Sequence, residues 1–218
     1  MTQRIADYYP AKVNMHVPDC AYAAAVVHNG PNEFSLGTPP VLDADGILDG
    51  HSIATAGSTS TFNVLMLSTS FGEFGRNVTV VASGAATSLV TVKGRDYLGQ
   101  PMLEDFTLNG TSPVVGVKAF KTIEEVVYGA TGGTTIDVGW ADKLGLPYAV
   151  TSVLKELEDG AVASAGTLVA RSVATQSSTS ADPRGTYDPA SACDGALEFS
   201  LVMMCDRDNL HGVAHYYA

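Results

Sequence analysis

The amino-acid sequence predicts a mainly β protein, a β-sandwich or barrel-like domain with few helices. Turn-forming Gly, Pro, Ser and Thr recur about every 8 to 12 residues, the spacing typical of short strands in such folds. Runs rich in Val, Thr and Phe lie between these turns. Several runs alternate in polarity, so that Val78 and Val80 share one face while Asn77 and Thr79 point to the other.

The expected strands are bounded by turn residues and are rich in β-branched or aromatic side chains. In the first part of the chain they cover residues 61–69, 77–83, 88–94, 101–108 and 114–129. In the second part they cover residues 134–140, 148–158, 166–173 and 196–205. Helix signals are weak. They are confined to residues 21–27 and 153–159, and β-branched residues interrupt the second of these.

The charged stretch TVKGRDYLGQPMLEDFTL (91–108) is interpreted as a β-hairpin rather than an active site. Gly94 and Gly99 are suited to the connection, because glycine adopts positive φ without steric cost. We expect the turn residues Arg95 and Asp96 to be solvated.

The neighbouring carboxylates of this stretch do not form an acid–base pair. Successive residues of a strand point to opposite faces, so Glu104 and Asp105 cannot act together on one substrate. The same reasoning applies to Glu124 and Glu125.

Two further regions differ from the strand pattern. Residues 1–50 contain five of the ten prolines and little alternation, which predicts an extended N-terminal arm ahead of an all-β domain at 51–218. Residues 174–195 are predicted to be a long polar loop, of the kind that is functional or disordered in compact domains.

Composition restricts the possible partners. The formal net charge of -11, with 12 scattered Lys and Arg residues, argues against nucleic-acid binding, which requires a concentrated basic face. The apolar runs are too short to span a membrane. Three cysteines without CxxC spacing predict reduced thiols. The N-terminus lacks the apolar run of a secretory signal, so synthesis in a cytoplasm is expected.

No motif predicts catalysis, a cofactor or a metal. The sequence lacks a G-x-S-x-G elbow, a phosphate-binding loop and a dinucleotide fingerprint. Asp43, Asp45 and Asp49 lack the remaining ligands of a calcium loop and are interpreted as Asp-Gly turns. His211 and His215 have a zinc-like spacing without the catalytic Glu, and are interpreted as part of a polar or interfacial tail.

Several phrases in a fixed order resemble a group of tailed-bacteriophage virion proteins. They span roughly residues 61 to 205, and each consists of turn and strand residues. The phrases are GRNVTVVASGA, TVKGRDYLGQPMLEDFTLNGT, GVKAFKTIEEV, IDVGWADKLGLPY and DPRGTYDPASACDGALEFSLV.

The resemblance implies a structural virion component that is not an enzyme, most similar to a head decoration (cement) protein at the capsid surface. It implies the major capsid protein as partner and a homo-oligomer, with a trimer as the candidate state because an icosahedral shell has three-fold positions. A tail, adaptor or baseplate component remains an alternative. A receptor- or glycan-binding β-domain is a further alternative.

Aromatic and arginine side chains are the predicted contact residues, because Tyr and Arg are enriched at binding hot spots. In the arm these are Tyr8, Tyr9 and Tyr22, and in the long loop they are Arg184 and Tyr187. The alternative is that the tyrosines cover the chain's own core.

Overall fold

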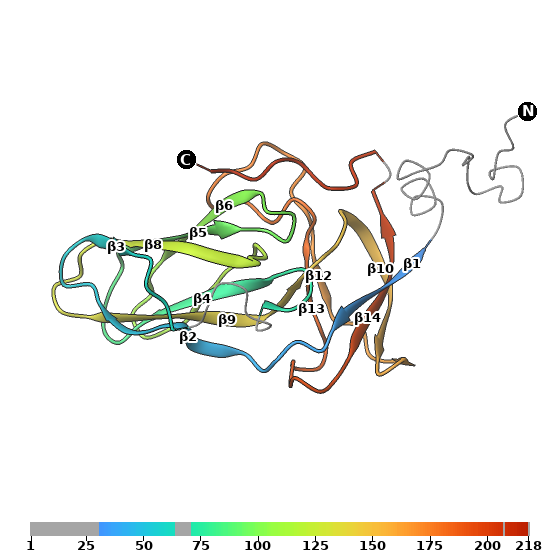
Figure 1. Cartoon of the computed structure of the whole chain (residues 1–218), viewed down its shortest axis with the longest axis horizontal. Helices are drawn as coiled ribbons and strands as arrows, with labels where there is room; N and C mark the ends of the chain where they lie inside the picture. Colours follow the sequence, from blue (N-terminus) through green and yellow to red (C-terminus); the bar gives the residue numbers. More distant parts are fainter. Residues whose placement is uncertain (1–30, 64–70, 207, 218) are drawn as a thin grey trace, which may run out of the picture.

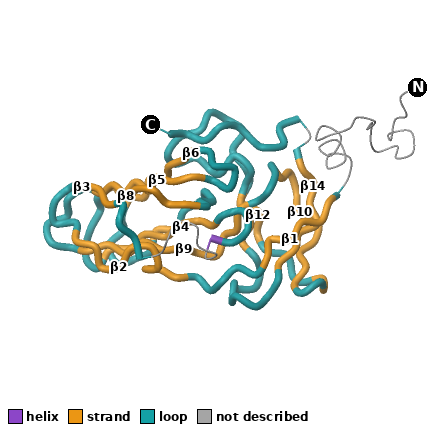
Figure 2. The backbone as a smooth tube through the Cα atoms, viewed as in Figure 1, coloured by secondary structure: helices purple, strands orange, loops and turns teal. Residues whose placement is uncertain are grey.

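The computed structural model describes residues 31–63, 71–206 and 208–217, which form fourteen strands in three sheets. Strands and loops make up nearly all of the described residues (Figure 2). The predicted mainly β fold is confirmed. Within the described residues, no helix has the length and apolarity needed to cross a bilayer.

The sheets have simple orders. Sheet A contains, in order, β1 (Asn32–Gly37), β14 (Phe199–Cys205), β10 (Val150–Glu158) and β11 (Ala161–Val162). Sheet B contains β12 (Thr167–Val169), β13 (Thr186–Asp188), β9 (Thr135–Gly145), β4 (Arg76–Ala82) and β7 (Val114–Val115), and β2 (Asp43–Ser52) also pairs with β9. Sheet C contains β3 (Gly57–Thr59), β8 (Thr122–Tyr128), β5 (Leu89–Arg95) and β6 (Pro101–Thr107).

Two hydrophobic cores hold these sheets together. Sheets B and C form a β-sandwich around the first core, which includes Val80 from β4 and Val92 from β5. The second core lies under sheet A and includes Leu201 and Phe199. The long strand β9 joins the two, because Val138 lies in the first core and Leu144 in the second. Figure 1 shows the sandwich on the left and sheet A on the right.

The predicted hairpin over residues 91–108 is confirmed by the pairing of β5 with β6. Val90 lies opposite Phe106 and Val92 opposite Glu104. Glu104 is buried and Asp105 is only partly buried, as expected for neighbours on opposite faces. The sequence around 153–159 forms β10 and not a helix. Of the expected strand 61–69, residues 61–63 lie outside any strand, and the remainder lies outside the described residues.

The predicted arm at residues 1–50 is wrong for the part that the structure describes. β1 pairs with β14 and β2 pairs with β9, so the proposed boundary at residue 50 falls inside β2. Both strands bury side chains, including Leu36 and Ile47. Register shifts interrupt both pairings, which explains why these residues lack clear alternation. Residues 1–30 lie outside the described residues.

Most of the segment 174–195 lies outside strands, as the prediction of a long loop requires. It contains the short strand β13 and buries the side chains of Gln176, Asp182, Arg184 and Cys193. This segment is therefore part of the folded scaffold.

Gly139 shows how closely β2 approaches β9. A Cβ atom added at Gly139 would overlap the backbone oxygen of Asp43 on β2, where no side-chain rotation can relieve the clash. Gly57 on β3 provides a contrast, because its added Cβ would lie 3.4 Å from the nearest atom, the Tyr128 hydroxyl oxygen.

We predict that Gly139→Ala lowers the free energy of unfolding by about 2 to 3 kcal/mol, because the strands must separate to accept the methyl group. Gly57→Ala, the matched control, is expected to change it by less than about 0.5 kcal/mol. Urea denaturation of both variants measures these changes. Equal stability of the two variants would contradict the close approach of β2 and β9.

Candidate functional site: buried ionic clusters

Many charged side chains from the turn and loop motifs are buried inside the protein. These residues come from all three sheets and from the segments that join them. The fully or nearly fully buried charged residues in the described part of the chain are Arg76, Asp96, Glu104, Lys118, Glu156, Asp182 and Arg184.

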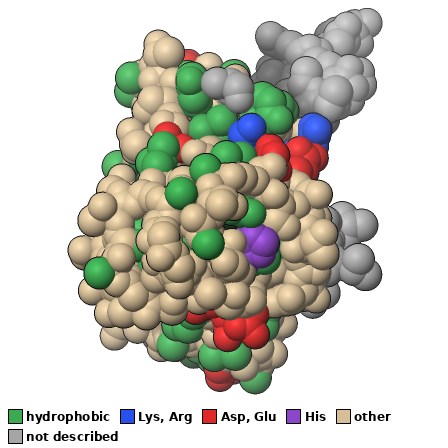
Figure 3. All heavy atoms as spheres, turned by 90° about the vertical axis from the view of Figure 1, so that its left-hand side faces the viewer, with side chains coloured by type: hydrophobic (Ala, Val, Ile, Leu, Met, Phe, Trp, Pro, Cys, Tyr) green, Lys and Arg blue, Asp and Glu red, His purple; other side chains and the backbone are tan. Residues whose placement is uncertain are grey.

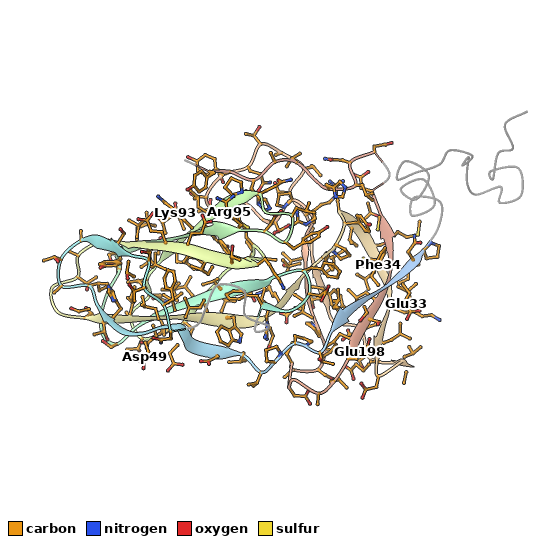
Figure 4. All side chains as sticks on the ribbon, viewed as in Figure 1. Glu33, Phe34, Asp49, Lys93, Arg95 and Glu198 are labelled. Carbon is orange, nitrogen blue, oxygen red and sulfur yellow. The ribbon has the colours of Figure 1, made fainter. Side chains whose placement is uncertain are left out.

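Asp96 organises the turn between β5 and β6. Its Oδ1 accepts hydrogen bonds from the backbone N–H groups of Leu98 (2.9 Å) and Gln100 (2.8 Å). The prediction that Asp96 is solvated is wrong, since its side chain is 0% exposed. Its neighbour Arg95 is exposed, as predicted, but it ends strand β5 rather than lying in the turn, and it forms an ion pair of 2.6 Å with Glu124. Figure 4 labels Arg95 on β5.

Arg184 is the reason that Asp96 can be buried. Arg184 Nη1 donates to Asp96 Oδ2 at 2.7 Å, and both side chains are almost completely inaccessible. Arg184 Nε also donates to the carbonyl oxygen of Leu146, and the guanidinium carbon lies 4.8 Å from the centre of the Tyr97 ring. The loop at 182–184 is thereby fixed to the hairpin turn, 88 positions away in the sequence.

The C-terminal segment joins the same cluster through His215. Its Nε2 lies 3.4 Å from Asp96 Oδ2. Burial by itself raises the pKa of Asp96, but His215 and the Arg184 guanidinium outweigh this effect and hold the pKa at about 2. The carboxylate is therefore ionised at neutral pH. Side chains from two other segments, distant in the sequence, therefore meet the turn at this carboxylate.

A second cluster fixes the outer edge of β6. Glu104 accepts hydrogen bonds from the backbone N–H groups of Val117 (2.7 Å) and Lys118 (3.3 Å). The Lys118 ammonium donates to the carbonyl oxygens of Leu103 (2.9 Å) and Ser177 (2.7 Å). These bonds attach β6 to residues 117 and 118, and they attach Lys118 to the loop after β12, where strand pairing does not provide partners.

Burial dominates the titration of this second cluster. It raises the pKa of Glu104 to about 7, although the two backbone donors and Lys118 favour the charged form. Burial also lowers the pKa of Lys118.

Two more clusters stabilise the second core. Tyr187 donates its hydroxyl proton to Glu156 Oε2 at 2.7 Å, and Gly166 N–H donates to the same oxygen at 2.6 Å. Arg76 pairs with Asp142 at 2.9 Å.

Cys193 belongs to this core as well, and burial raises the pKa of its thiol to about 12. It is therefore a buried, protonated side chain rather than a nucleophile.

The predicted contact residues divide into two groups. Arg184 and Tyr187 are each 1% exposed, so their assignment as surface contacts is corrected: both stabilise the chain's own interior. Their residue types indicated strong interactions correctly, but not that the partners lie within the same chain. Tyr8, Tyr9 and Tyr22 lie outside the described residues.

The candidate metal ligands do not converge. Within the described ranges, no group of three or more His, Cys, Asp or Glu side chains is placed to hold a metal ion. Asp43 accepts a hydrogen bond from the backbone of Asp45 within β2. The His211 ring packs against Tyr148, whereas His215 faces Asp96.

Two open depressions lie on the surface of the sandwich. One, of about 500 Å³, is lined by small residues of the β4–β5 and β8–β9 connections, including Ala86, Ser88 and Thr131. The other depression, of about 300 Å³, lies on the outside of sheet C beside Lys93 and Tyr216.

The left-hand end of Figure 1 faces the viewer in Figure 3, where backbone and uncharged polar groups dominate the centre of the view.

Comparison of the chain with protein-family models, with curated proteins and with solved structures found no match in any of the three. The roles of these residues therefore rest on the geometry described above.

We predict that Asp96→Asn lowers the free energy of unfolding at pH 7 by about 3 to 5 kcal/mol, because it leaves the buried Arg184 charge without its partner. Glu124→Gln removes the exposed ion pair with Arg95 and is expected to cost no more than about 1 kcal/mol. Because the folded-state pKa of Asp96 is about 2, below the usual 3.8, its contribution is lost only as the pH falls through this interval. Denaturation at pH 7 compares the variants, and equal losses would contradict the structural role of the buried pair.

We predict that Glu104 makes the protein less stable as the pH rises from about 4.5 to about 7. In this window the folded protein holds a proton on Glu104 that the unfolded chain releases. The slope from this one group reaches about 1.4 kcal/mol per pH unit. Glu104→Gln removes the titration, so the difference in stability between wild type and variant should change across the window. Parallel stability profiles would contradict the raised pKa, and Glu124→Gln provides the control.

Proposed function

We propose that this chain is a structural virion protein that binds the outside of a bacteriophage capsid and cements neighbouring capsid subunits. The proposal begins from the ordered phrases that resemble virion proteins. The structure supports it because residues of those phrases form hydrogen bonds that join separate segments of the chain.

The observation that carries the proposal is that the charged and aromatic residues of these phrases stabilise the scaffold. Arg76, Asp96, Lys118 and Arg184, from four different phrases, each form hydrogen bonds that join separate segments. In the remaining phrase, Trp140 donates its indole N–H to the carbonyl oxygen of Val41 at 3.0 Å. The residues of these phrases thus specify a rigid β-framework whose segments are joined by hydrogen bonds and ion pairs.

A rigid framework suits a protein that stabilises a shell. Binding loses less conformational entropy when the partner-facing elements are already ordered. A tail, adaptor or baseplate component would benefit from the same rigidity and differs mainly in the number of copies per particle.

Quantitative mass spectrometry of purified virions tests the proposal. We expect a copy number comparable to that of the major capsid protein, and density for this chain on the outer capsid surface by electron microscopy. A few copies per particle would assign the chain to the tail or baseplate, and its absence from virions would overturn the proposal.

A further inference from the structure

The outer face of sheet A is apolar at its centre. Along β14, Leu201 and Met203 point into the second core, so Val202 and Met204 point outward. Figure 1 shows sheet A at the right-hand end of the molecule.

The neighbouring strands extend this apolar surface. Leu157 on β10 lies opposite Ser200 of β14 and therefore shares the outer face, and Val162 on β11 lies opposite Leu157. Leu154 is the extra residue of a bulge in β10 and is 53% exposed. Val162 is 66% exposed.

Opposite charges flank the centre of the face. Val202 lies opposite Glu33 of β1 on one side and opposite Lys155 of β10 on the other, so the three side chains form one row across the sheet. Both charged residues are exposed. In the part of the chain that the structure describes, neither takes part in an ion pair. Figure 4 labels Glu33 on β1.

We propose that this face binds the same face of a second copy of the chain, in a symmetric dimer whose two-fold axis runs parallel to β14. Rotation about that axis places the β1 side of one sheet over the β10 side of the other. Lys155 of each copy then faces Glu33 of the other, and Val202 packs against Val202 near the axis. The inference is independent of the virion role.

The arrangement satisfies two requirements of a self-complementary interface. It places an apolar residue, Val202, between two opposite charges in one row, so apolar burial and charge pairing occur in the same interface. A two-fold interface uses each contact twice, so one Lys155–Glu33 row supplies two ion pairs. The chain as a whole carries a net charge of -11, which opposes self-association, but in this row one positive and one negative charge balance.

The orientation of the axis predicts the effect of one more residue. Glu198 immediately precedes β14. Its carboxylate accepts a hydrogen bond of 2.8 Å from the Ser35 hydroxyl, which does not neutralise its charge. The axis brings Glu198 of the two copies toward each other at the end of the interface. Glu198→Gln should therefore tighten the dimer. An axis perpendicular to β14 would instead bring the two Lys155 side chains together.

Charge-swap variants of the full chain test the proposal by sedimentation over a concentration series. We expect the wild type to be a dimer. Lys155→Glu and Glu33→Lys should each raise the dissociation constant of the dimer at least about 10-fold, because each creates two like-charge contacts. The double variant restores the opposite pairing and should return to near wild-type affinity. Val202→Arg should give a monomer.

Leu89→Arg is the matched control, since Leu89 is an exposed apolar residue on sheet C. A wild type that stays monomeric at all concentrations would overturn the proposal, as would a trimer that is insensitive to these changes. Failure of the double swap to restore the dimer would also overturn it. Thermal unfolding of each variant confirms that the exposed substitutions leave the fold intact, and the double swap distinguishes lost association from lost folding.

Discussion

The ion pair between Asp96 and Arg184 is the interaction on which the arrangement of the loops depends. Both side chains are buried, and desolvation of a charge that lacks a partner costs several kcal/mol. The hairpin turn that carries Asp96 and the loop that carries Arg184 must therefore dock together. His215 brings the C-terminal segment to the same carboxylate. One buried charge thus determines the relative positions of three segments that share no strand pairing.

The same principle recurs wherever the chain leaves its sheets. Buried backbone groups require partners, and irregular segments cannot obtain them from a β-ladder. Glu104 supplies acceptors for residues 117 and 118, Glu156 supplies one for Gly166, and the Lys118 ammonium satisfies two carbonyl groups. Charged side chains therefore perform the role that ladder hydrogen bonds perform within the strands. This explains how a protein with long connections forms two compact cores.

Local sequence patterns were enough to predict the sandwich, but not the buried ion pairs and hydrogen bonds that join its distant segments. Alternation in the sequence identified β4, β5 and β6, although only β5 buries a single face, because β4 also buries Asn77 and Thr79 on its other face. It failed for β2, where register shifts break the repeat. The turn at Asp96 was recognised from neighbouring residues, whereas its burial depends on Arg184, far away in the sequence. The residue types of Arg184 and Tyr187 indicated strong contacts without indicating that these contacts lie inside the molecule.

Internal use of the charged residues has a consequence for the surface. Arg184 and Lys118 are bound by acceptors of their own chain, so these two side chains are not available to a partner. Sheet C pairs four of its outward charges locally, Lys93 with Glu125 and Arg95 with Glu124. Sheet A leaves Lys155 and Glu33 on opposite sides of an apolar centre. A rigid scaffold that holds this face fixed can offer it to a matching surface with little further ordering. The buried ionic clusters would then serve association indirectly, by keeping the outer faces in one shape.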